Sequence, residues 1–177
     1  MKNFKLFVLL TACLTVWPVL AADKASQNIP MMTYVNARFQ FEVNYPKDLL
    51  EPDPPPDNND GLNFYSKDKQ VHLVVTGRYN VLDYSWKQEF QSALDLLKDT
   101  KITYKVFKKN TFVISGYRGD KIFYHKEITV MEDDSEVYLI FEIEYPQKDK
   151  GTWNAIAATC ASSFKMSKDS SQTDDFK

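Results

Sequence analysis

The chain has few of the residues from which metal sites, disulfides and phosphate-binding loops are built. Its 177 residues include two cysteines, two histidines and five glycines. Structural zinc sites need four closely spaced ligands, and nucleotide-binding loops need clustered glycines. Neither pattern is present, because His72, His125 and Cys160 are far apart and the glycines are scattered. We therefore expect no metal ion and no cofactor.

The chain also lacks an excess of basic residues. It has 22 Lys and Arg against 24 Asp and Glu, a net charge of −2. Lys2 and Lys5 are the only charged residues of 1–22, so the rest of the chain has 20 basic and 24 acidic side chains and a net charge of −4. We see no basic stripe. Binding to nucleic acid requires clustered Lys and Arg, so we expect no nucleic-acid partner.

Residues 1–22 have the pattern of a secretory signal peptide. A positively charged start precedes a mostly apolar run, which ends in Ala21 and Ala22. A transmembrane anchor needs about 20 unbroken apolar residues, whereas this shorter run is interrupted by Thr11, Thr15 and Pro18. We expect cleavage after Ala21 or Ala22 and a periplasmic location, with secretion as an alternative.

Leu10-Thr11-Ala12-Cys13 resembles a bacterial lipobox, in which the cysteine is lipidated. The residues after Cys13 are still apolar, whereas the mature start of a lipoprotein is normally polar. Lipidation at Cys13 therefore remains the alternative to cleavage after Ala21 or Ala22. It is the only way in which we expect the protein to attach to a membrane. Cleavage after Ala22 leaves Cys160 as the single cysteine, which excludes an intramolecular disulfide.

The rest of the chain fits one domain at 34–166, between a flexible leader at 23–33 and a disordered tail at 167–177. Alternating apolar and polar residues, with short turns between them, predict an antiparallel sheet. Apolar residues at helical spacing predict two helices. The expected strands are 39–45, 62–65, 71–79, 102–107, 111–117, 121–131 and 136–145, and the expected helices are 84–99 and 151–164. This pattern predicts an α+β fold, mainly antiparallel sheet packed by helices.

The second expected helix places Cys160 in the middle of its apolar face. That face comprises Trp153, Ile156, Ala157, Cys160, Ala161 and Phe164. We therefore expect a buried core thiol and not a reactive one.

Candidates for catalysis are few. Ser115, His125 and Asp120 could form a catalytic trio, but Ser115-Gly116 is not a Gly-x-Ser-x-Gly elbow. Glu142 and Glu144 share one face of a strand and could act as an acid and base pair. We expect these two glutamates to form a solvent-facing polar edge instead, and we assign no catalytic residue.

Exposed loops and tyrosines are better candidates for binding. The Asp57–Gly61 stretch lacks the ligand spacing of a calcium loop, so we expect the whole Pro-rich segment at 51–61 to be a solvated loop. The acidic turn at 132–136 is a second exposed feature. Tyrosine is favoured at interfaces, and the candidates for an exposed aromatic face are Tyr79, Tyr84, Tyr117, Tyr124 and Tyr138.

Several landmarks follow one another in a recognisable order. They are a Phe-x-Phe-x-Val-x-Tyr-Pro run at 39–46, the Pro-rich loop, Phe112-Val113-Ile114-Ser115-Gly116, Tyr145-Pro146, and Trp153 in a closing helix. This order resembles the Mog/PsbP-like family, as in bacterial DcrB-type envelope proteins and the PsbP subunit of photosystem II. The resemblance covers 34–166 and implies an α/β/α sandwich and an accessory or interaction role. It carries over no functional residues.

We therefore expect a non-enzymatic periplasmic accessory domain that binds a protein partner through its sheet face or its Pro-rich loop. One version is an immunity protein that neutralises a basic toxin. The alternative is a small periplasmic hydrolase that uses Ser115, His125 or the two glutamates. A concave pocket that joins His72 or His125 to a carboxylate would favour the hydrolase, whereas a flat or aromatic surface would favour binding.

Overall fold

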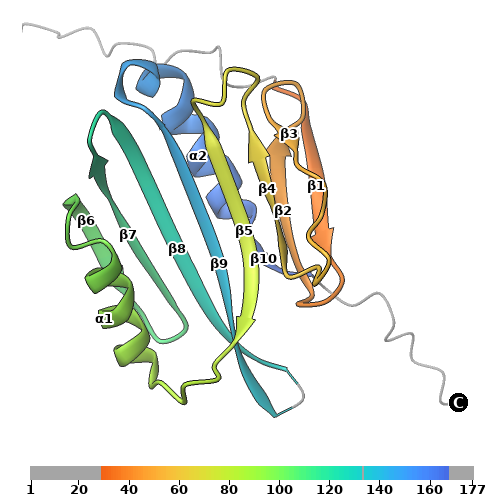
Figure 1. The fold of residues 1–177 in the computed structure, drawn as a ribbon, viewed down its shortest axis with the longest axis vertical. Coiled ribbons are helices and arrows are strands. Elements are labelled where there is room, and N and C mark those ends of the chain that lie inside the picture. Colours follow the sequence, from red (N-terminus) through yellow and green to blue (C-terminus); the bar gives the residue numbers. More distant parts are fainter. Residues whose placement is uncertain (1–28, 133, 168–177) are drawn as a thin grey trace, which may run out of the picture.

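A computed structural model describes residues 29–132 and 134–167. The signal peptide expected at 1–22 and all but the first residue of the tail expected at 167–177 lie outside these residues. The described residues form two antiparallel sheets and two α-helices (Figure 1).

The larger sheet has seven strands and contains the expected meander. Its order is β3-β4-β5-β9-β8-β7-β6, and every neighbouring pair is antiparallel. The strands are β3 (Glu51–Pro52), β4 (Gly61–Tyr65), β5 (His72–Tyr79), β6 (Lys101–Phe107), β7 (Thr111–Arg118), β8 (Lys121–Glu132) and β9 (Ser135–Pro146). The hairpin of β4 and β5 and the succession of β6 to β9 confirm the strands predicted from alternation.

The smaller sheet has the order β1-β2-β10. Its strands are β1 (Met31–Asn36), β2 (Phe41–Pro46) and β10 (Lys165–Met166). The expectation that 23–33 is a flexible leader is wrong for its last three residues, because Met31, Met32 and Thr33 pair with the second half of β2. The two-residue strands β3 and β10 were not expected, since two residues are too few to show a period.

The main core lies between one face of the large sheet, the small sheet and α2 (Lys150–Ser163), which follows a short 3₁₀ helix, η2 (Gln147–Asp149). The whole apolar face predicted for the second helix is buried, Cys160 included. Lys126 of β8 donates from Nζ to the carbonyl oxygens of Ala161 and Phe164 at 2.7 and 3.1 Å. A cation at this position satisfies carbonyls that the end of the helix leaves unpaired.

A second, smaller cluster lies on the opposite face of the large sheet, under α1 (Trp86–Leu96). It contains the apolar stripe predicted for the first helix, packed on Phe112, Ile114 and Phe123. α1 is shorter than the expected 84–99. Ser85 is its N-cap, and the Ser85 and Gln88 side chains form a capping box, which places the preceding residue outside the helix.

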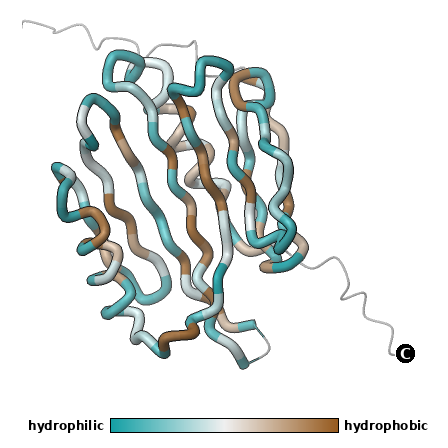
Figure 2. Tube along the Cα trace, in the orientation of Figure 1, coloured by the Kyte–Doolittle hydropathy of each residue, from teal (hydrophilic) through white to brown (hydrophobic). Residues whose placement is uncertain are grey.

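Strand alternation determines what each face of the large sheet carries. In β9, Val137, Leu139, Phe141, Ile143 and Tyr145 belong to the main core. The intervening Glu142 and Glu144 point to the other face, which α1 covers only beside β6 and β7 (Figure 1). Figure 2 shows the same alternation as hydrophobic and hydrophilic segments along β5, β8 and β9.

The α+β class and the antiparallel sheet are thus confirmed, and α1 and α2 lie on opposite faces of the large sheet. The more specific Mog/PsbP-like sandwich stays a prediction. No helix among the described residues is long and apolar enough to span a membrane.

Candidate functional site

The residues proposed for a serine hydrolase are not brought together. Ser115 pairs with Tyr124 across β7 and β8, whereas His125 pairs with Ile114. Since successive side chains of a strand point to opposite faces, Ser115 and His125 project from opposite sides of the sheet. Ser115 Oγ donates to the carbonyl of Phe123 at 2.8 Å. The hypothetical Ser115–His125–Asp120 trio is therefore not assembled.

His125 instead lies between two carboxylates on the face that α1 partly covers. Its Nδ1 is 2.9 Å from Glu142 Oε2, and its Nε2 is 2.8 Å from Glu127 Oε1. An ionised carboxylate only accepts hydrogen bonds, so both ring nitrogens must donate and the ring is an imidazolium. Burial disfavours the charged ring, but the hydrogen bonds to Glu127 and Glu142 prevail and raise the pKa of His125 to about 9.

The ion pairs of His125 continue along the same face. Arg118 contacts both Glu142 and Glu144, and the side chains of these glutamates are only 26% and 16% exposed. The expectation that they form a solvent-facing edge is therefore wrong. β9 is an inner strand, and the two carboxylates are partly buried beneath Arg118. Burial alone would raise the pKa of Glu142, but the hydrogen bond from His125 lowers it below its ordinary value.

One further buried carboxylate, Glu89, belongs to α1 itself. Glu89 accepts a hydrogen bond from Arg78 at 2.5 Å. Burial, and then the charge of Glu127, raise the pKa of Glu89 despite that arginine. One oxygen of Glu127 has no hydrogen-bond partner among the described residues. The hydrogen-bonded network of His125 therefore spans β7, β8 and β9, and the Arg78–Glu89 pair joins β5 to α1 separately.

His72 lies apart from this network's hydrogen bonds. Its Nε2 is 3.0 Å from Asn63 Oδ1, and its ring stacks on Tyr65 at 4.3 Å between centroids. Burial lowers the pKa of His72, so the ring is neutral at pH 7. The described residues contain no group of three or more His, Cys, Asp or Glu side chains that could hold a metal ion.

The five candidate tyrosines separate into two groups. Tyr138 is fully buried, and its hydroxyl donates to the carbonyl of Tyr84 at 3.0 Å. Tyr79 is the last residue of β5 and precedes the loop that contains Tyr84. Tyr117 and Tyr124 lie on the opposite side of the sheet, next to α2. Only these last two belong to a common hollow.

That hollow, here called the tyrosine groove, is a cavity of about 280 Å³. Residues of β6, β7, β8 and β9 form its floor, and α2 forms one wall. It is lined by Thr103, Ser115, Gly116, Tyr117, Ile122, Tyr124, Tyr145, Asn154, Ala157 and Ala158. None of these side chains is charged. The ring of Tyr145 is buried, and its hydroxyl donates to Asn154 Oδ1 at 3.0 Å.

The tyrosines of the groove are close enough to influence one another. Burial, and then Tyr104, raise the pKa of Tyr124. Burial, and then Tyr117, raise the pKa of Tyr145. Tyr124 and Tyr145 therefore stay neutral at pH 7, and they present hydroxyl groups and ring faces without charge to the groove.

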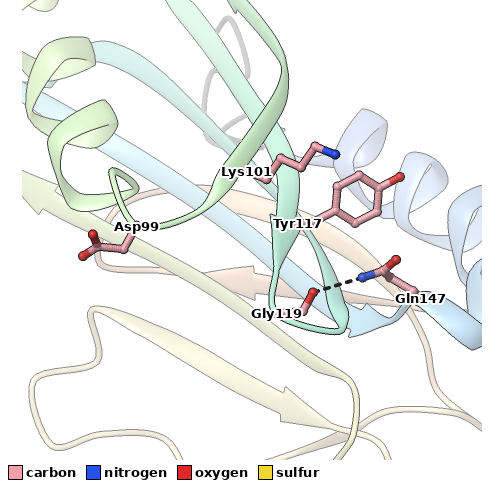
Figure 3. Close-up of a pocket in the computed structure, with 5 residues that line it drawn as sticks. All are labelled: Asp99, Lys101, Tyr117, Gly119 and Gln147. Carbon is pink, nitrogen blue, oxygen red and sulfur yellow. Dashed lines mark hydrogen bonds between the residues drawn. The ribbon is translucent and has the colours of Figure 1, made fainter.

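Tyr117 also lines a second cavity of about 550 Å³ with Asp99, Lys101, Gly119 and Gln147. Figure 3 shows Tyr117 and Lys101 extending toward α2, while Asp99 points to the other side. Gln147 Nε2 donates to the carbonyl of Gly119 at 3.0 Å and ties η2 to the β7–β8 turn. Tyr117 is the one residue that the linings of the two cavities share.

The wall of the groove is also uncharged. Between Lys150 and Lys165, α2 and its C-cap contain no charged residue. The exposed positions of this segment hold Gly151, Thr152, Asn154, Ala155, Ala158, Thr159 and Ser162. A solvent-exposed helix usually has charged residues on its outer face. This surface is therefore unusual for a helix that faces only water.

No family model and no curated protein matches the sequence. The solved structures that match it include the following two. A protein from Bacteroides thetaiotaomicron VPI-5482 is 11% identical with a TM-score of 0.47, over 77% of this chain and 48% of that one. LpqN, involved in cell envelope biogenesis in Mycobacterium tuberculosis, is 10% identical with a TM-score of 0.45, over 78% of this chain and 85% of that one.

The chain spans about half the length of the first of these structures. Because both TM-scores lie below 0.5, neither similarity supports a conclusion about family or function. The resemblance to Mog/PsbP-like proteins stays a prediction.

Proposed function

We propose that this chain is a non-enzymatic accessory domain of the bacterial envelope, which binds a protein partner through the tyrosine groove and the adjoining outer face of α2. The observation that carries the proposal is the composition of the groove. Three tyrosines line it, and its ten lining residues include no charged side chain. The interior of protein interfaces is enriched in aromatic residues and depleted of Lys, Asp and Glu.

The outer face of α2 suits the same use. Its small side chains, such as Ala155 and Ala158, allow the backbone of a partner to approach closely. The rings of Tyr117 and Tyr124 offer apolar area with few rotatable bonds, so that little conformational entropy is lost on binding. Asn154 and the phenolic hydroxyls supply hydrogen bonds at defined positions.

The His125 network supports this proposal more than a hydrolase. A catalytic histidine needs a free nitrogen within reach of a substrate or nucleophile, whereas both nitrogens of His125 are bound by carboxylates. Neither His125 nor His72 lines the two cavities described above. The envelope location rests on the pattern of 1–22, and attachment through Cys13 stays the alternative to a free periplasmic protein.

Site-specific photo-crosslinking in the native envelope tests the proposal. A photoreactive residue at Ala158, on the exposed wall of the groove, is expected to form one dominant adduct with a protein. The control is the same residue at Lys67, which is exposed in the β4–β5 turn and should give no such adduct. Equal background at both positions would remove the support for a partner at this surface.

A further inference from the structure

The large sheet has one long open edge among the described residues. β6 pairs with β7 on one side, and no described strand pairs with its other side. The opposite edge, β3, has two residues, and one is Pro52, which has no backbone N–H. β6 spans seven residues. One row of its N–H and C=O groups therefore faces outward and is available to an added strand.

Five lysines gather along and beside this edge, although the chain as a whole is acidic. They are Lys98, Lys101, Lys105, Lys108 and Lys109, and all are exposed. None of them forms an ion pair with the described residues. The only acidic residue between 98 and 109 is Asp99. These lysines form a local cluster of positive charge, and two of them, Lys101 and Lys105, belong to β6.

Two large side chains of β6 are exposed as well. Tyr104 is 55% exposed and pairs with Ser115 on the side of the tyrosine groove. Phe107 is 44% exposed and pairs with Phe112 on the side of α1. A strand added beside β6 would place alternate side chains against each of them, because successive side chains point to opposite faces.

We propose that β6 accepts an acidic, extended segment of the protein partner as an additional strand of the large sheet. This inference rests on the proposed function and names the part of the partner that is bound. Backbone hydrogen bonds to β6 would supply affinity, the lysines would select acidic side chains, and the row facing α2 would enter the rim of the tyrosine groove.

The position of the lysines favours a single extended chain over a lipid surface or a nucleic acid. Lys101 pairs with Tyr117, and Lys105 pairs with Ile114. A β-bulge between Ile102 and Tyr104 shifts the register between them, so the two lysines lie on opposite faces of β6. The positive charge therefore follows the edge of the sheet and does not form one flat face for a bilayer or a duplex.

Lysines and a bulge on an edge strand also protect a sheet against aggregation. Under that alternative, the edge of β6 would reject every added strand, an acidic one included. The two explanations therefore predict opposite results for an acidic peptide of extended conformation.

The probe is a short fluorescein-labelled peptide in which Glu alternates with Val or Thr, added to the protein purified from the envelope. We expect saturable binding in fluorescence anisotropy that weakens at high salt. A peptide with Lys in place of Glu should not bind. A Glu peptide methylated on every backbone nitrogen should not bind either, because it has no N–H group to donate to the strand.

Charge reversal of the strand provides the decisive variants. Lys101→Glu with Lys105→Glu should weaken binding of the Glu peptide about tenfold or more and allow the Lys peptide to bind. Lys67→Glu, at an exposed turn far from β6 along the sheet order, should change neither. Absence of Glu-peptide binding to the unmodified protein would overturn the proposal, as would equal binding of the methylated peptide.

Photo-crosslinking separates this inference from the function on which it rests. Lys105 is exposed on β6, on the face opposite the groove. Protein adducts from both Lys105 and Ala158 support both proposals. Adducts from Ala158 alone leave the proposed function intact and overturn the bound strand, whereas adducts from neither position overturn both.

Discussion

His125 and Glu142 form a hydrogen bond of 2.9 Å across β8 and β9, one of two bonds that together require the histidine to be charged. The other ring nitrogen faces Glu127, so a neutral ring would leave one nitrogen as an acceptor facing an acceptor. Removing one partner of a buried ion pair leaves an uncompensated charge. The pair therefore holds the centre of the large sheet together on the face opposite α2.

The first prediction concerns pH. Because the pKa of His125 is raised from 6.5 to about 9 in the folded protein, its contribution to the free energy of unfolding is complete below about pH 6.5 and is lost as pH rises through 9. His125→Gln should cost about 3 kcal/mol at pH 6, and this cost should shrink toward pH 10. Urea unfolding at a series of pH values measures it.

His72→Gln is the matched control, because burial lowers the pKa of His72. This variant should leave the decline between pH 7 and pH 10 unchanged. Nitrogen chemical shifts of the His125 ring should show both nitrogens protonated at pH 7.5. An ordinary imidazole titration near pH 6.5 would contradict the charged network.

The second prediction concerns the floor of the tyrosine groove. A Cβ added to Gly116 would lie 2.1 Å from the carbonyl oxygen of Lys101, because the bulge in β6 brings its backbone close. Gly116→Ala should lower the free energy of unfolding by about 2 kcal/mol or more. Gly151→Ala in α2 meets no atom within 4 Å and should stabilise the protein by up to about 1 kcal/mol. Equal effects in thermal unfolding would show that the close approach at Gly116 is absent.

The third prediction concerns the thiol. Cys160 is fully buried in the core, and burial raises its pKa to about 12. The native protein should not react with a disulfide reagent at pH 8, and it should react completely in urea. Cys160→Ser should cost about 1–3 kcal/mol more than Cys160→Ala, because the serine hydroxyl is left without water in an apolar core. Rapid reaction of the folded protein would contradict the buried position.

The fourth prediction concerns the start of the mature protein. Cleavage after Ala22 gives a first residue of Asp23 and a mass without lipid. Cys13→Ser should then change neither the mass nor the location, and intact-protein mass spectrometry measures both forms. A diacyl mass on a chain that starts at Cys13 would establish the lipid-anchored alternative.

The features that were predictable from the sequence are those with a local period. The alternation of Val137 to Tyr145 and the helical spacing of Trp153 to Phe164 each identify a buried face, because those residues occupy one side of a regular element.

Features that depend on which strands become neighbours were not visible. Glu142 and Glu144 looked like an exposed edge, because the sequence does not tell that β9 becomes an inner strand flanked by β5 and β8. The lysines around β6 are close together in the sequence, but only the sheet order shows that they lie along an open edge. Tyr117, Tyr124 and Tyr145 come from three strands, so the tyrosine groove exists only once the meander and α2 are assembled.

The most direct test of binding at the tyrosine groove uses the partner protein that crosslinks to a photoreactive residue in place of Ala158. The affinity of this partner is measured for two variants of the chain. Ala158→Arg puts a charge on the outer face of α2, and Gln91→Arg puts the same charge on the exposed face of α1. We predict that Ala158→Arg weakens the affinity about tenfold or more, while Gln91→Arg leaves it unchanged. Equal affinities for both variants would contradict binding at this surface.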